Sequence, residues 1–302
     1  MKIILTGANG QLGKALLKKL NNYYDSNPCF EIIAPLRDKL DLRNSDFCKN
    51  YIKIHKPDFL INLAAYTSVD NAEKENDLAK QINSEAPRSF AEAIKDYGGY
   101  LIQLSTDYVF DGQNSSPYKI NDIKNPLGIY GKTKLEAEIA IEENLSHKNQ
   151  FSTIRTSWII SPWRKNFAKT MLTLLKENKK ELKIVSDQIG CTTSVFTLTE
   201  VILKIIKYKI NKKALSNYFH FSDAGVASWY DVAEAIKEIS NNIGLLDSNV
   251  LIKPIFSEDY PTPCKRPNFS LLNSYNTYKE LDLKPSYWKV ELQKVLELIN
   301  KT

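Results

Sequence analysis

The chain has 302 residues, of which 43% are hydrophobic and 25% are charged. This length suits one large α/β domain or a nucleotide-binding domain with a smaller lobe, and the composition excludes a disordered chain. No apolar run approaches the roughly 20 residues that span a bilayer, so no membrane partner is expected. The net charge of +6 comes from lysines interleaved with glutamates, the usual pattern of a solvated face, and no nucleic-acid partner is expected.

The cysteines and histidines are few and scattered along the sequence. None of them forms a CxxC or Cys/His spacing, which argues against a disulfide framework and against a zinc site. The chain is therefore expected to work in a reducing cytoplasm with no metal ligands assigned. The residues concerned are Cys29, Cys48, Cys191, Cys264, His55, His147 and His220.

Short β-type apolar runs alternate with helical patterns along the first half of the chain. This alternation is typical of βαβ units, so the expected fold is α/β, a Rossmann-type doubly wound parallel sheet. The expected strands are residues 2–5, 31–34, 59–62, 100–105 and 151–155. The expected helices are residues 12–20, 46–55, 77–94 and 130–143.

The alternation weakens in the second half. Helices are expected at residues 166–177, 198–208, 229–243 and 290–301, with one strand at 217–221. The prolines in residues 260–267 exclude a helix and predict a rigid loop. We expect a Rossmann domain over residues 1–157 and a mainly substrate-binding, smaller C-terminal lobe over residues 158–302, some segments of which can return to the first domain.

The first strand runs into TGANGQLG, residues 6–13, which opens the first helix with glycines spaced as GxxGxxG. Such a loop lets the backbone approach a pyrophosphate at a helix N-terminus, where unpaired N–H groups favour negative charge. An ordinary glycine-rich turn is the alternative, but a strand before and a helix after is the context that a dinucleotide loop requires. The candidate cofactor-binding residues are Gly7, Gly10, Gln11, Leu12 and Gly13.

The second strand ends at the position whose side chain normally contacts the adenosine ribose. The residues that follow include Arg37 and Asp38, which offer a basic side chain for a 2′-phosphate and an acid for a ribose hydroxyl. Arg37 favours NADPH and leaves NADH open, although a surface Arg–Asp pair is an alternative reading. Asp41 and Leu42 are expected to flank the adenine.

Tyr130 and Lys134 stand four residues apart at the start of a helical pattern, so they share one face. A tyrosine beside an ammonium group can donate a proton to a ketone as hydride arrives, and the ammonium stabilises the phenolate. The YxxxK pattern alone is weak evidence for such a catalytic site. It gains meaning from Ser105 and Thr106 at the end of the preceding strand, where a hydroxyl can polarise the same carbonyl, although plain strand-end capping is the alternative.

With these motifs in order, the chain resembles the dTDP-4-dehydrorhamnose reductase family of extended short-chain dehydrogenases. The resemblance extends from residue 3 to about residue 275. The matching blocks are residues 6–13, 62–73, 105–112, 126–136, 155–158, 166–171, 187–190, 229–231 and 260–263.

The resemblance implies a role for several residues. Thr106, Tyr130 and Lys134 correspond to a catalytic triad, and the loop of Ala64, Ala65 and Tyr66 corresponds to one that lines the cofactor. An indole buries the apolar face of a pyranose well, which suits a substrate contact. The implied substrate residues are Ser105, Thr106, Asp107, Trp158, Asn166 and Arg266, although core packing of Trp158 and a turn role for Asp107 are alternatives.

The resemblance also implies an activity: the NADPH-dependent reduction of the C4 ketone of dTDP-4-dehydro-L-rhamnose to dTDP-L-rhamnose. Gly128, Ile160 and Thr192 depart from the family pattern, which normally has Asn, Tyr and Pro there, and the last two put the particular sugar in doubt. A reductase or epimerase of another nucleotide-linked deoxysugar therefore stays open. So does a non-catalytic NADP-binding subunit like the β subunit of methionine adenosyltransferase.

The oligomeric state and the need for Mg2+ are left open by the sequence. Some members of the family dimerise through Mg2+ bound by acidic side chains, but no such site is located here. A monomer or a homodimer is expected, with a nucleotide sugar as the substrate.

Overall fold

The computed structural model describes residues 1–25, 31–177 and 180–301, so Cys29 lies outside the described residues. Its centre is a six-stranded parallel sheet in the order β10-β5-β4-β3-β1-β2, which confirms the expected fold class. The strands are β1 (Lys2–Thr6), β2 (Glu31–Ile33), β3 (Phe59–Asn62), β4 (Tyr100–Thr106), β5 (Phe151–Thr156) and β10 (Tyr218–Phe221). The sixth strand thus comes from the second half of the chain.

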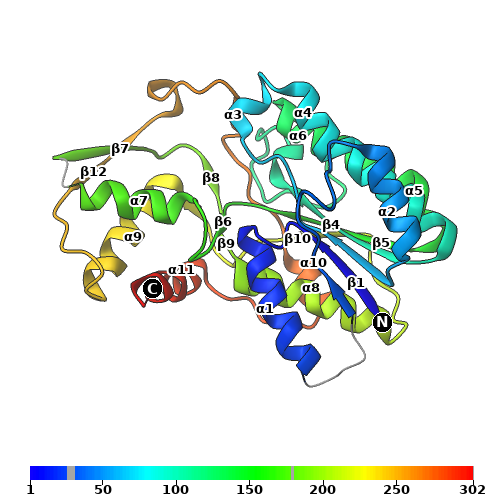
Figure 1. Cartoon of the computed structure of the whole chain (residues 1–302). Coiled ribbons are helices and arrows are strands. Elements are labelled where there is room, and N and C mark those ends of the chain that lie inside the picture. The colour runs from blue at the N-terminus through cyan, green and yellow to red at the C-terminus, as the bar shows by residue number, and fades with distance from the viewer. Residues whose placement is uncertain (26–30, 178–179, 302) are drawn as a thin grey trace.

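Helices cover both faces of this sheet (Figure 1). One face packs against α1 (Gln11–Asp25) and α8 (Val195–Ile210), whose apolar side chains share a core with β1, β3 and β10. The other face packs against α2 (Ser45–His55), α5 (Ala86–Tyr97) and α6 (Ile129–Leu145). Both faces are therefore buried, which explains why the strands read as continuous apolar runs.

The helix expected at residues 77–94 is interrupted in the structure. It consists of α4 (Asn76–Lys80), a π-helical turn (Gln81–Glu85) and α5. Asn83 in that turn receives a hydrogen bond from the Tyr66 amide at 2.8 Å and donates one to the Tyr66 carbonyl at 3.0 Å. The irregular turn thus holds the loop that follows β3, and π turns often occur where a helix serves a functional site.

A second core lies beside the sheet, at the left of Figure 1. It is built by α7 (Phe167–Lys176), α9 (Trp229–Asn242) and α11 (Trp288–Asn300), together with the parallel pair β7 (Glu181–Val185) and β12 (Leu251–Ile255). Short elements complete the fold: α3 (Val69–Ala72), α10 (Tyr275–Glu280), β6 (Ile159–Ile160) paired with β9 (Thr193–Ser194), and β8 (Ile189–Gly190) paired with β11 (Ala227–Ser228).

The strand order places a topological switch point at β1, because β2 lies on one side of it and β3 on the other. Open α/β sheets bind ligands in the crevice outside the carboxyl ends of the strands at such a point. The glycine loop after β1, the loop after β3 and the ends of β4 and β5 all lie at this edge. Among the described residues, no helix is long and apolar enough to cross a membrane.

Candidate active site

The glycine loop has the geometry that close approach of a phosphate requires. Gly7 has φ of +70°, and a Cβ there would lie 2.7 Å from the Ala64 amide nitrogen. A Cβ on Gly13 would lie 2.1 Å from the Gly7 carbonyl oxygen, so only glycine lets α1 begin so close to the loop. The N-terminus of α1 therefore faces the crevice with its first N–H groups free for an anion.

A cavity of about 610 Å³ runs from the glycine loop across the ends of β3, β4 and β5. It brings together most of the residues that the sequence singled out. Those that line it are Gly7, Gly10, Gln11, Leu12, Gly13, Ala64, Ala65, Ser105, Thr106, Asp107, Tyr130, Lys134 and Trp158. Its size and its mixed polar and apolar walls suit a nucleotide-type ligand.

A second cavity of about 270 Å³ lies on the other side of the glycine loop and is lined by Arg37, Asp41 and Leu42. The Asp41 carboxylate forms a bidentate ion pair with Arg43, with distances of 3.0 Å from Nε to Oδ1 and 2.5 Å from Nη2 to Oδ2. The hydrogen bond from Arg43 lowers the pKa of Asp41. The Asp41 carboxylate is therefore already paired with the Arg43 guanidinium, whereas the Arg37 side chain is exposed.

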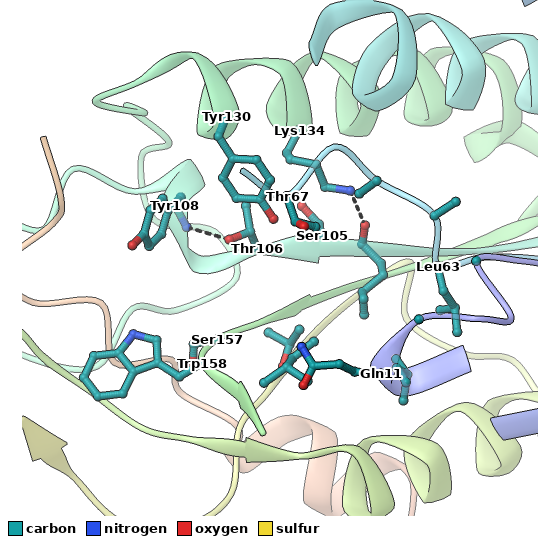
Figure 2. A pocket seen from close by; sticks show the side chains of 18 of the residues that line it. Gln11, Leu63, Thr67, Ser105, Thr106, Tyr108, Tyr130, Lys134, Ser157 and Trp158 are labelled. Atoms are coloured by element: carbon teal, nitrogen blue, oxygen red, sulfur yellow. Dashed lines mark hydrogen bonds between the residues drawn. The ribbon is translucent and has the colours of Figure 1, made fainter. Parts of the chain in front are cut away.

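Tyr130 projects from the first turn of α6 with its hydroxyl pointing toward Thr106 (Figure 2). Burial raises the pKa of Tyr130 to about 12, while the Thr106 hydroxyl acts in the opposite direction. The Thr106 hydroxyl donates to Asp107 Oδ1 at 3.0 Å and accepts from the Tyr108 amide at 3.2 Å. A protonated phenol and a fixed hydroxyl thus face the same part of the cavity, as a carbonyl-reducing site needs.

Lys134 lies one helical turn after Tyr130 and is buried. Its Nζ donates a hydrogen bond to the Leu104 carbonyl at 2.6 Å (Figure 2). Burial lowers the pKa of Lys134 to about 8, and the carboxylate of Glu138 raises it. The lysine is therefore held at the end of β4 and is mainly charged at neutral pH.

Glu138 belongs to a buried ionic group beneath the cavity. Its carboxylate accepts from Arg155 Nη2 at 2.7 Å and from the Ser105 hydroxyl at 2.5 Å. Both charged residues are only 1% exposed. The Ser105 hydroxyl is thus directed toward Glu138, although its residue lines the cavity.

The far end of the cavity carries two stacked indoles. Trp158 has a left-handed backbone, with φ of +47°, and its ring lies 3.7 Å from that of Trp229 at an interplanar angle of 12°. Ser157 and Trp158 face the opening from the end of β5 (Figure 2). Asp107 lies nearby, and burial raises the pKa of its carboxyl to about 6. Hydrogen bonds from the Ser270 and Thr106 hydroxyls act in the opposite direction on this pKa.

Three predicted site residues lie outside both cavities. Tyr66 directs its hydroxyl to the Glu75 carboxylate, while its backbone is held by Asn83 as described above. Asn166 caps α7 by accepting from the Lys169 amide at 3.2 Å. Arg266 forms an ion pair with Asp70 at 2.9 Å. All three stay proposals as binding residues, and the structure gives each of them a second role in holding a loop.

Several cavity residues received no individual role from the sequence, although most of them lie in the matching blocks. They are Asn9, Leu63, Thr67, Val69, Leu104, Tyr108, Thr156, Ser157, Ile159, Arg164 and Trp229. Trp229 is the first residue of α9, inside the Ser228–Asp231 capping box, and the matching block at residues 229–231 was the available signal. Arg164 gave no signal, because it belongs to no motif in the series.

The departures from the family pattern lie outside the cavity. Ile160 is buried in the second core, and Thr192 is fully buried. Gly128 is the N-cap of α6. The described residues contain no group of three or more His, Cys, Asp or Glu side chains that could hold a metal ion, and Cys48, Cys191 and Cys264 are free and buried.

The glycine loop at the switch point of a parallel sheet and the Tyr130–Lys134 pair opposite Thr106 define an oxidoreductase of the short-chain dehydrogenase type. The family model described as "RmlD substrate binding domain" matches residues 1–300. The chain belongs to this family. It is a dTDP-4-dehydrorhamnose reductase-like, NAD(P)H-dependent oxidoreductase that acts on nucleotide sugars.

Relatives match over nearly the whole chain. A dTDP-4-dehydrorhamnose reductase of Aggregatibacter actinomycetemcomitans is 36% identical, over 97% of this chain and 98% of its own. The crystal structure of such a reductase from Clostridium acetobutylicum is 36% identical with a TM-score of 0.88, over 99% of each chain. Another, from Bacillus anthracis in complex with NADP, is 32% identical with a TM-score of 0.85, over 98% of this chain and 99% of its own.

Proposed function

We propose that the protein reduces the C4 ketone of dTDP-4-dehydro-L-rhamnose to dTDP-L-rhamnose with NADPH, as a step in making a bacterial surface-polysaccharide precursor. The observation that carries this proposal is the joint position of Thr106 and Tyr130 in a cavity that begins at the glycine loop and ends at the indole of Trp158. The names of the full-length relatives support the same substrate.

The cavities fit a dinucleotide. The cradle around Gly7 and Gly13 suits its pyrophosphate, and the adjoining smaller cavity suits its adenosine. The Asp41 carboxylate is paired with Arg43, so it is a poor acceptor for a ribose hydroxyl, whereas Arg37 is available for a 2′-phosphate. This arrangement supports NADPH over NADH, and the NADP complex of the Bacillus anthracis relative agrees with it.

The bound dinucleotide supplies the hydride. Tyr130 then gives its proton to the ketone oxygen as the hydride reaches the carbon, so the product is an alcohol and the side chain becomes a phenolate. Thr106 polarises the same oxygen by a hydrogen bond. Lys134, charged at neutral pH, stabilises the phenolate electrostatically and holds the ribose next to the nicotinamide.

The indole end of the cavity suits the sugar. Trp158 and Trp229 are stacked on each other and both line the cavity, so they offer apolar ring surface to the C–H surface of a pyranose. The Asp107 carboxylate is buried among the residues that line the cavity, beside the Ser270 hydroxyl, and can accept a hydrogen bond from a sugar hydroxyl. Ile160 and Thr192 are buried and do not line the cavity, so they give no reason to prefer another sugar.

The test is to incubate the pure protein with dTDP-4-dehydro-L-rhamnose and NADPH and to follow the loss of nicotinamide absorbance. We expect oxidation of NADPH and formation of dTDP-L-rhamnose, with turnover reduced about 100-fold in Tyr130→Phe because proton donation contributes on that scale. Well-folded protein that oxidises no NADPH would overturn the proposal. Faster turnover of another nucleotide-linked keto sugar under the same conditions would reassign the substrate.

A further inference from the structure

Arg164 lies at the wall of the large cavity, although neither the sequence motifs nor the chemistry above gives it a role. Its Nε donates a hydrogen bond to the Asn9 carbonyl at 2.9 Å. Asn9 is part of the glycine loop, between Gly7 and Gly10. The guanidinium is therefore fastened to the loop on which a pyrophosphate would dock.

Most of the donor capacity of this guanidinium is still available. A guanidinium has five N–H donors, and the bond to Asn9 uses only the one on Nε. Within residues 1–25, 31–177 and 180–301, no carboxylate forms an ion pair with Arg164, and its side chain is exposed. Its two Nη groups can thus form the paired hydrogen bonds that suit phosphate oxygens.

The backbone at Arg164 is unusual for this residue type. Its φ is +58°, in the left-handed region that favours glycine, and arginine has no short side chain to compensate. The Asn166 side chain holds this segment, because its Nδ2 donates to the Arg164 carbonyl at 3.5 Å and to Gln11 Oε1 at 3.0 Å. An arginine with a left-handed backbone that lines a ligand cavity is a candidate binding residue, because strained backbone often occurs at ligand sites.

We propose that Arg164 is a diphosphate-binding residue that covers the pyrophosphate of the bound dinucleotide from the side opposite the N-terminus of α1. This inference rests on the dinucleotide function proposed above and adds a residue to it. The nucleotide sugar also carries a diphosphate, but the bond to Asn9 places Arg164 at the glycine loop, whereas Trp158 and Trp229 mark the sugar end.

The experiment compares dissociation constants of the wild-type protein and of Arg164→Gly, measured by titration with NADPH, adenosine 2′-monophosphate and dTDP. We expect the dissociation constant of NADPH to rise about 10- to 100-fold, the usual range for losing a hydrogen bond to a charged group. That of adenosine 2′-monophosphate should stay unchanged, because this probe has no pyrophosphate. The thermal midpoint should rise, because glycine accepts the left-handed backbone.

Lys165→Ala is the matched control, since it removes the same charge from an exposed neighbour that lines no cavity. It should leave the affinity for NADPH within about twofold of the wild type. Unchanged NADPH affinity in Arg164→Gly would overturn the inference, as would a loss confined to dTDP, which would assign Arg164 to the nucleotide sugar instead. Wild-type protein that binds no NADPH would overturn the proposed function itself.

Discussion

Lys134 is a buried cation whose charge depends on its neighbours. Burial disfavours the ammonium form and lowers its pKa to about 8, and the carboxylate of Glu138, one turn further along α6, partly offsets this effect. Arg155 and Ser105 hold that carboxylate in place. The catalytic lysine is thus linked to an ion pair that does not line the cavity.

We expect Glu138→Gln to move the alkaline limit of catalysis to lower pH. Without the carboxylate, the pKa of Lys134 falls below about 8, so its positive charge is lost as the pH rises through that lower value. The profile of kcat/KM against pH reports ionisations of the free enzyme and is the measurement. The alkaline limb of this profile should shift to lower pH. If Glu138 had a purely structural role, kcat/KM would fall at every pH and the limb would stay at the same pH.

Two further variants separate the effect of the Glu138 charge on the pKa of Lys134 from a loss of stability. Glu142→Gln, one turn further on and exposed, should leave the alkaline limb in place. Glu138→Gln leaves a buried arginine unpaired, which costs about 3–5 kcal/mol. The double variant Glu138→Leu with Arg155→Met removes both charges at similar volume and should show the same shift with a smaller loss of stability. An unmoved limb in both variants would contradict the role given to Glu138.

At this scale the sequence predicted the residues that belong to short motifs. Tyr130 and Lys134 share a helical face, and Gly7 and Gly13 flank one turn, so local spacing suffices to predict them. Arg164 is different, because its partner Asn9 lies 155 positions away and no local pattern reports that contact. The same holds for the ion pair between Glu138 and Arg155, which only the packing of α6 on β5 creates.

Helix α6 carries Tyr130 and Lys134, and its first turn is capped by another element. Its N-cap residue Gly128 has no side chain to satisfy the first N–H groups. The Glu73 carboxylate, just after α3, accepts from the Ile129 amide at 2.8 Å instead. This acid also complements the positive end of the helix dipole. The orientation of the catalytic helix thus depends on a residue 56 positions earlier.

We expect Gly128→Asn, the residue typical of the family, to destabilise this protein by about 1–3 kcal/mol, the usual cost of overpacking. A Cβ at residue 128 would lie 2.3 Å from Cys264 Sγ and 2.7 Å from the Glu73 carboxylate, so an added side chain forces both of these groups to move. Urea denaturation measures the loss. Adding Cys264→Ala to Gly128→Asn removes the sulfur and should restore most of the lost stability. Wild-type stability of Gly128→Asn alone would show that the contact relaxes freely.

The elements that the sequence predicted well are those with a strong periodic pattern. All six sheet strands and α1, α2 and α6 follow from apolar runs and helical spacing. The strands β7 and β12 were missed, because β12 carries Pro254 and β7 has two lysine or glutamate residues facing outward. Their pairing joins segments about 70 residues apart, which no local signal reveals.

At the scale of the whole molecule, the glycine loop is tied to the segment that leads into the second core. Gln11 at the start of α1 contacts Ser161 and Asn166, and Arg164 contacts Asn9. Asn166 is also the N-cap of α7, whose buried side chains belong to the second core. The two cores therefore meet at the place where the cofactor is proposed to bind.

Two variants of Gln11 should separate stability from cofactor affinity. Gln11→Ala removes the acceptor of Asn166 and should lower the free energy of unfolding by about 1–2 kcal/mol, as measured with urea. Gln11→Glu keeps an acceptor oxygen, so its stability should stay within about 0.5 kcal/mol of the wild type.

Titration with NADPH should nevertheless show weaker binding in both Gln11 variants. In Gln11→Ala the segment carrying Arg164 loses its anchor, and in Gln11→Glu a new negative charge faces the pyrophosphate. Equal stability of the two variants would contradict the idea that this contact couples the glycine loop to the second core.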